Sequence, residues 1–205
     1  MPNRRPRQQR TRSPRQSGPQ NKATYVRWRC GRRSGAIILL VVTDSLAAYP
    51  AINVRLLLAN RNLHPLDDHV DMAVRIGPLS DSSLVATRIG SMRAVVCASP
   101  KFLAGRGVLR SPEDLAALPC VNFDFLSPAS TWPFRLADAK GIIEVPIRPR
   151  LSVSTAEAPV WAALQGVGAT RVLHYQCVDA LHDGSLRIVL ADFELEPLPV
   201  HLIHA

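Results

Sequence analysis

The chain has 205 residues, of which 47% are hydrophobic, and a formal charge of +9 at pH 7. This length suffices for one medium domain or two small lobes, and the composition indicates a globular protein. Residues 1–35 hold ten Arg, one Lys and no acidic residue, whereas the rest of the chain holds 14 basic and 16 acidic side chains. The folded body therefore carries no electrostatic signature of a nucleic-acid-binding surface.

The four cysteines are far apart and form no C-x-x-C pair. A zinc site needs closely spaced ligands and a disulfide scaffold needs a dense Cys framework, so the sequence favours neither. Three of the cysteines lie in apolar runs and are predicted to be reduced core residues of a cytoplasmic protein. These are Cys97, Cys120 and Cys177.

Residues 1–35 form a leader that is rich in Arg, Pro, Gln and Ser. Such a segment cannot bury enough surface to offset its ordering entropy, so it is predicted to be disordered. One interpretation is an unstructured tail, or an unrelated reading frame joined to a domain. Another is an arm that binds the phosphates of nucleic acid or anionic lipid. The acid-poor composition also imitates an organelle transit peptide.

An apolar helix is predicted over residues 36–49, because Pro50 disfavours helical geometry at the residue before it. Its apolar run 36–42 is too short to span a membrane, which favours a core helix over a signal sequence. A strand over residues 53–59, a short helix over 63–69 and a strand over 71–76 follow. This order predicts a parallel sheet with a right-handed crossover.

Several residues around the short helix are of types that bind zinc or iron. Solvated groups on a surface helix are the simpler interpretation, so no metal site is predicted. The residues concerned are His64, Asp67, Asp68, His69 and Asp71.

The run from Asp71 to Pro100 organises the rest of the chain. Its strand stops at Gly77-Pro78, a polar loop follows, and a second extended run covers residues 88–98. Ser99 can then cap a helix that has Pro100 in its first turn. A long extended path without a helix predicts a hinge, where the chain passes from one lobe to another.

The second lobe is predicted to hold further helices from Pro100 and from Ser111, and then a strand over residues 120–125. Trp132 and Phe134 either line a pocket or plug the core, and the sequence leaves both alternatives open. The remaining predicted strands cover residues 142–153, 169–173, 186–190 and 200–203, with a helix over 175–181.

Ser154 and Glu157 have the spacing of a capping box directly after a strand. This pattern places a helix N-terminus at the carboxyl end of a strand, where its free N–H groups suit a carboxylate ligand. Pro159 is expected inside the first two turns, where it would tilt the helix.

No enzyme is predicted. The sequence has no G-x-S-x-G elbow, phosphate loop or dinucleotide fingerprint, and its six His show no ligand spacing outside the segment already discussed. No cofactor is predicted either.

The run VDMAVRIGPLSDSSLVATRIGSMRAVVCASPKFL, residues 70–103, resembles the effector-binding domain of LysR-type transcriptional regulators. The similarity extends roughly from Leu39 to Ala205. It implies an α/β, periplasmic-binding-protein-like (type II) fold of two lobes, with crossovers near Ser91 and Ala191. Residues 36–91 plus 192–205 would form the first lobe and residues 92–191 the second. The resemblance also implies that the family's first strand, its winged helix-turn-helix and a final helix are missing.

The resemblance implies that the domain binds a small, anionic metabolite between its lobes to control transcription, in the cytoplasm and as a homodimer or tetramer. DNA would be contacted through a domain absent from this chain, or weakly through the leader, and no membrane is involved. The expected effector-binding residues are Arg75, Ile76, Gly77, Pro78, Ser127, Ser154, Thr155 and Gly168. The alternatives are a solute-binding protein of a transporter, a nonspecific nucleic-acid binder acting through its leader, and a nonfunctional gene fragment.

Overall fold

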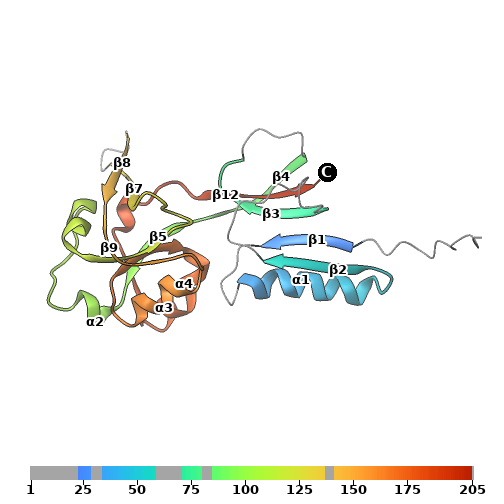
Figure 1. Cartoon of the computed structure of the whole chain (residues 1–205), viewed down its shortest axis with the longest axis horizontal. Coiled ribbons are helices and arrows are strands. Elements are labelled where there is room, and N and C mark those ends of the chain that lie inside the picture. Colours follow the sequence, from blue (N-terminus) through green and yellow to red (C-terminus); the bar gives the residue numbers. More distant parts are fainter. Residues whose placement is uncertain (1–22, 29–33, 59–70, 80–84, 137–140, 205) are drawn as a thin grey trace, which may run out of the picture.

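The computed structural model describes residues 23–28, 34–58, 71–79, 85–136 and 141–204. They form two five-stranded sheets, each with its own helices, which lie end to end as two lobes (Figure 1). No helix in these ranges is long and apolar enough to cross a membrane.

The first sheet has the strand order β2-β1-β3-β12-β4. β1 pairs in parallel with β2 and β3, whereas β12 is antiparallel to both β3 and β4. The helix α1 (Ser34–Ala48) packs on one face through Ile38, which contacts a cluster that includes Val74 and Val200. The strands are β1 (Ala23–Trp28), β2 (Asn53–Leu58), β3 (Met72–Ile76), β4 (Val85–Met92) and β12 (Leu198–His204).

The expectation that no strand precedes the first helix is wrong. β1 runs through six residues inside the predicted disordered leader and pairs along its whole length with β2. Thr, Tyr, Val and Trp favour a pleated strand, and this tendency outweighs the basic flanks because β1 occupies an interior place in the sheet. Of the rest of the predicted leader, residues 34–35 belong to α1, and residues 1–22 and 29–33 lie outside the described residues, as does the predicted helix over residues 63–69.

The second sheet has the order β11-β5-β10-β6-β9. β10, β6 and β9 run parallel, whereas β5 is antiparallel to β10 and β11. The helices α3 (Ala158–Leu164) and α4 (His174–His182) pack against it. The strands are β5 (Ala94–Ala98), β6 (Pro119–Phe123), β9 (Arg148–Val153), β10 (Ala169–Leu173) and β11 (Arg187–Val189).

Two short helices follow β5. The helix α2 (Pro100–Leu103) begins at the proline as predicted, although the Ser99 side chain makes no capping hydrogen bond within the part of the chain that the structure describes. The 3-10 helix η1 (Pro112–Ala117) has Asp114 in its first turn, and the carboxylate accepts hydrogen bonds from the N–H groups of Arg110 (2.8 Å) and Ser111 (3.0 Å).

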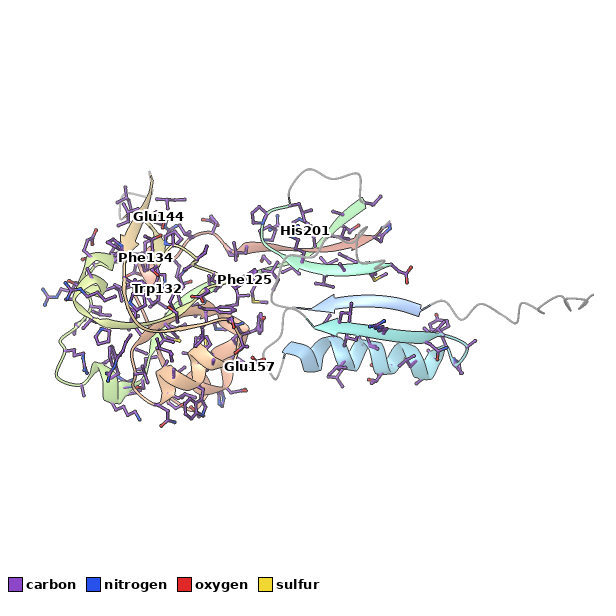
Figure 2. The ribbon with its side chains drawn as sticks, viewed as in Figure 1. Phe125, Trp132, Phe134, Glu144, Glu157 and His201 are labelled. Carbon is purple, nitrogen blue, oxygen red and sulfur yellow. The ribbon has the colours of Figure 1, made fainter. Side chains whose placement is uncertain are left out.

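A hairpin of β7 (Thr131–Arg135) and β8 (Ile142–Pro146) closes the main core of the second lobe. Trp132 is 0% and Phe134 3% exposed, and both belong to the largest buried cluster (Figure 2). Of the two alternatives for this aromatic pair, the core plug is therefore confirmed. Cys97, Cys120 and Cys177 are buried free thiols, as predicted.

Two crossovers connect the lobes and lie side by side. The first passes from β4 through Arg93 into β5, and the second leaves the 3-10 helix η2 (Ala191–Phe193) and enters β12. β12 pairs with β4 from its first residue, with Leu198 opposite Met92. The two connections predicted near Ser91 and Ala191 are thus neighbours in the structure.

Candidate functional site

The carboxyl ends of parallel strands from both sheets meet between the lobes. Ile76 ends β3 and Leu173 ends β10, and both belong to one buried cluster. Leu126, which follows β6, and Tyr175 at the start of α4 pack against the same cluster. Open α/β sheets bind their ligands beyond the carboxyl ends of the strands. This junction is therefore the first place to look for a site.

A pocket of about 880 Å³ opens on the second lobe at this junction, between α3, α4 and the end of β9. Its volume is in the range of small-molecule sites. Figure 2 shows Glu157, one of its residues, on the side of the second lobe that faces the first. The lining is Leu151, Thr155, Ala156, Glu157, Ala158, Val160, Trp161, Ala162, Leu164, Tyr175, Gln176 and Asp179.

Most of the pocket wall is apolar, and Trp161 contributes a large aromatic surface that is 66% exposed. Gln176 supplies a fixed polar group: its Oε1 accepts a hydrogen bond from the Leu173 N–H at 2.8 Å. Its Nε2 is buried and has no hydrogen-bond partner among the described residues. A buried amide donor without a partner is costly, so an acceptor atom of a ligand would gain from meeting it.

The charges of the pocket differ from those expected. Its lining contains the carboxyl groups of Glu157 and Asp179 but, among the described residues, no Lys or Arg. The expectation of an anionic ligand therefore finds no cation in this pocket.

Ser154 and Thr155 lie where they were expected, directly after β9, and both are exposed. The predicted capping box is wrong, however. Residues 154–157 form bends, and α3 begins at Ala158 with Glu157 at the N-cap and no side-chain capping bond. Pro159 explains the difference, because proline is preferred in the first turn and so fixes the helix start close before itself.

Ser127 also lies at this edge, in the loop after β6, but it is only 4% exposed. Its carbonyl oxygen accepts a hydrogen bond from Asn122 Nδ2 at 2.9 Å, and Asn122 Oδ1 accepts one from Trp132 Nε1 at 3.4 Å. The Ser127 hydroxyl is buried and has no partner among the described residues. A buried hydrogen-bond network therefore fixes the loop after β6 at this edge of the sheet.

The four residues expected from the first lobe have different places. Ile76 is buried in the cluster that joins the lobes. Gly77 has φ +108° and donates its N–H to Pro199 O at 2.9 Å, so this turn requires glycine. Pro78 is exposed just beyond it. Arg75 is half-buried and alternates with Val74 and Ile76, so it points to the sheet face opposite α1.

Gly168 is not brought together with the others. It precedes β10 and therefore lies at the opposite edge of the second sheet. A Cβ at this position would be 2.5 Å from Pro119 O, so glycine is needed for the close approach of β10 to β6.

Sequence reasoning missed several of the twelve residues that line the pocket, among them Trp161, Tyr175, Gln176 and Asp179. A signal was present for two of them. Tyr175 and Asp179 are four residues apart in a predicted helix and so share one face of it. Trp161 carried no such signal, because an aromatic residue in an apolar helix is ordinarily a core residue.

Comparisons with known proteins identify relatives over nearly the whole described chain. The family model described as LysR substrate binding domain matches residues 35–205. The chain is 27% identical over 169 residues to the "Uncharacterized HTH-type transcriptional regulator YhjC" of Escherichia coli (strain K12), covering 82% of this chain and 56% of that protein. It is 31% identical over 144 residues to the HTH-type transcriptional regulator CrgA of Neisseria meningitidis serogroup B, covering 70% and 47%. The chain thus spans about half the length of the curated relatives it matches.

Among solved structures, the chain is similar to the regulatory domain of AphB from Vibrio vulnificus. The TM-score is 0.76 at 22% identity, and the match covers 90% of each chain. The likeness confirms the predicted two-lobed, periplasmic-binding-protein-like α/β fold.

Proposed function

The chain belongs to the LysR substrate-binding domain family, and from this premise we propose that it binds a small effector between its lobes and so controls transcription. The observation that carries the proposal is the 880 Å³ pocket at the carboxyl edge of the second sheet, facing the first lobe. Family membership supports effector binding in general, and the pocket supports this particular place for it.

The lining favours a compact, largely apolar effector with a hydrogen-bond acceptor. The acceptor would meet Gln176 Nε2, and the apolar part would lie against Trp161. Thr155, Ser154 and Pro78 remain the proposed contacts at the rims of the two lobes. The two carboxyl groups of the pocket favour a neutral or amine-bearing ligand over the anion expected from the sequence.

The proposed mechanism is a shift in the relative position of the lobes. Such a shift requires the effector to prefer one arrangement over the other. The two adjacent crossovers supply the only covalent connections that the described residues make between the sheets, so the change would be concentrated there. Because curated relatives are HTH-type transcriptional regulators, we propose that the shift is transmitted to a DNA-binding helix-turn-helix.

The pocket is proposed to bind rather than to catalyse, and the site of action is proposed to be the cytoplasm.

Self-association is proposed as well. On α1, Leu39 is 44%, Leu40 62% and Val41 58% exposed, and a helix so apolar is ordinarily covered. A homodimer, or a tetramer built from it, would cover this surface. Light scattering on the purified chain tests this, and a monomer at all concentrations would contradict it.

A panel of small metabolites, screened by thermal unfolding and Trp fluorescence, tests effector binding. A true effector raises the melting temperature. The Trp161→Phe variant should keep most of this effect but lose the quenching, whereas Gln176→Leu should weaken binding by about tenfold or more. Val178→Thr is the matched control, because Val178 is on α4 but does not line the pocket. A ligand that stabilises all four proteins equally binds somewhere else.

Weak contact with DNA through the leader is a separate part of the proposal. It rests on the charge of residues 1–35 alone. Duplex DNA should bind the chain in low salt, and its affinity should fall steeply with added salt. A chain without residues 1–22 keeps β1 and is the appropriate comparison. Equal binding by both chains would dispose of this role.

A further inference from the structure

Three basic side chains form a row across the first sheet. His201 in β12 is in register with Arg75 in β3 and also with Arg88 in β4. Residues directly opposite each other on neighbouring strands point to the same face, and the strands are about 5 Å apart. The three side chains therefore start within roughly 10 Å of one another, with His201 in the middle.

The row lies on the face of the sheet away from α1. Val74 and Val200, the chain neighbours of Arg75 and His201, belong to the cluster that Ile38 of α1 packs against. Side chains alternate between the two faces of a strand. Arg75 and His201 must then point away from α1, and Arg88 points with them. Figure 2 shows His201 on β12, in the part of the first sheet beyond β1 and β2 from α1.

A β-bulge places Arg88 in the row. The pairing of β12 with β4 shifts between Val200 and His201, so that Val200 is opposite Gly90 and His201 is opposite Arg88. Ile89 is the extra residue. Bulges of this kind redirect side chains and are frequent next to functional sites. In a regular register without the bulge, His201 would instead be opposite Ile89.

The positive groups of the row are not balanced within the described part of the chain. No ion pair joins Arg75 or Arg88 to an acidic residue there. Among the described residues, Arg88 makes one long hydrogen bond, from Nε to Gly90 O at 3.5 Å, and the buried His201 Nδ1 has no partner. Arg75 and Arg88 lie on the two strands that flank β12, so their like charges are roughly 10 Å apart on one face of the sheet. An anion above the row would neutralise both guanidinium groups.

We propose that Arg75, His201 and Arg88 bind a small dianionic oxyanion, such as the phosphate group of a phosphate monoester. Guanidinium groups bind phosphate oxygens through pairs of parallel N–H bonds, and two of them approaching from opposite sides can hold one such group. The imidazole between them donates a third hydrogen bond once its ring turns. The site is on the first lobe and the α3–α4 pocket is on the second, so a failure of the effector proposal would not contradict this one.

The site also bears on the crossovers, because β4 and β12 carry the chain between the lobes. An anion that joins Arg88 to His201 holds these two strands together at the positions next to the bulge. Occupancy of the site would therefore stiffen the first-lobe side of the hinge.

Titration of the full chain with inorganic phosphate at constant ionic strength tests the proposal. Two readouts are needed: the NMR signals of the His201 imidazole, assigned with His201→Asn, and the melting temperature. Phosphate that binds the basic leader should bind folded and unfolded chains alike and so should not shift the melting temperature. Arg187→Gln is the matched control, because Arg187 is an exposed arginine of the other sheet.

The wild-type chain and Arg187→Gln should give the same saturable shifts. Arg75→Gln and Arg88→Gln should each weaken the apparent affinity by about tenfold or more, since each removes charge-assisted hydrogen bonds. Arg88 is exposed, so its variant carries the test even if Arg75→Gln does not fold. Equal titrations of Arg88→Gln and Arg187→Gln, or a linear rise without saturation in every protein, would overturn the proposal.

Discussion

The ion pair between the two crossovers offers the sharpest test of how the lobes are held. Arg93 is the one residue between β4 and β5, and Glu194 follows η2 on the return. The Arg93 guanidinium donates two hydrogen bonds to the Glu194 carboxylate, from Nε to Oε2 at 2.9 Å and from Nη2 to Oε1 at 3.0 Å. Their side chains are 48% and 13% exposed. The pair is thus bidentate, and its carboxylate is largely removed from water.

The magnitude follows from this geometry. An exposed pair contributes about 0.2–1 kcal/mol, whereas hydrogen bonds to charged groups with little access to water reach about 1.5–3 kcal/mol. The Arg93–Glu194 pair falls between these classes, and we expect a coupling free energy of about 1–1.5 kcal/mol. Arg93→Ala should cost more than Glu194→Ala, because it leaves the less exposed partner without its cation.

A double-mutant cycle by urea unfolding of wild type, Arg93→Ala, Glu194→Ala and the double variant measures this coupling. Arg93→Ala should lower the melting temperature by about 2–6 °C in a chain of this size. Small-angle scattering on the same proteins reports the separation of the lobes, which should vary more widely once the pair is gone. A coupling below about 0.3 kcal/mol with unchanged scattering would refute the reasoning, since that is the value for independent sites.

Two further predictions concern positions outside the hinge. Gly168→Ala should destabilise the chain by about 1–3 kcal/mol in urea unfolding, because its Cβ would be 2.5 Å from Pro119 O. Gly90→Ala is the control, since a Cβ there meets nothing within 4 Å, and similar losses in both variants would contradict the packing argument. The pKa of Asp114 is lowered, chiefly by the hydrogen bond from the Ser111 N–H, so its stabilising contribution is present above the ordinary aspartate pKa of about 3.9 and is lost as the pH falls through the folded-state pKa. Unfolding midpoints of Asp114→Asn and wild type should therefore converge at low pH, and a gap that does not change with pH would argue against this cap.

Elements whose signals are local could be predicted from the sequence. The turn at Gly77-Pro78, the extended run through the first crossover and the helix start at Pro100 each depend on a few adjacent residues. β1 was missed because its basic flanks dominated the composition of the leader. The start of α3 was misplaced because two local rules conflicted, and the preference of Pro159 for a first turn outweighed the capping-box spacing of Ser154 and Glu157.

The candidate sites could be predicted less well, for a physical reason. Thr155 was found because a strand end marks an edge where ligands bind. The alignment of Arg75, His201 and Arg88 depends on the register between strands far apart in sequence and on one bulge. Neither is encoded in the residues near any one of the three. The sequence alone does not distinguish an exposed pocket residue such as Trp161 from a buried core residue, because the difference depends on the tertiary packing.

The place of β12 between β3 and β4 has a consequence for synthesis on the ribosome. The second sheet is built from one continuous stretch, β5 to β11, and it can form as soon as that stretch has emerged. The first sheet must wait, with β3 and β4 lacking the strand that joins them, until β12 has left the exit tunnel. The lobe that begins first is therefore completed last, and during this interval its open strands are the part of the nascent chain most in need of a chaperone.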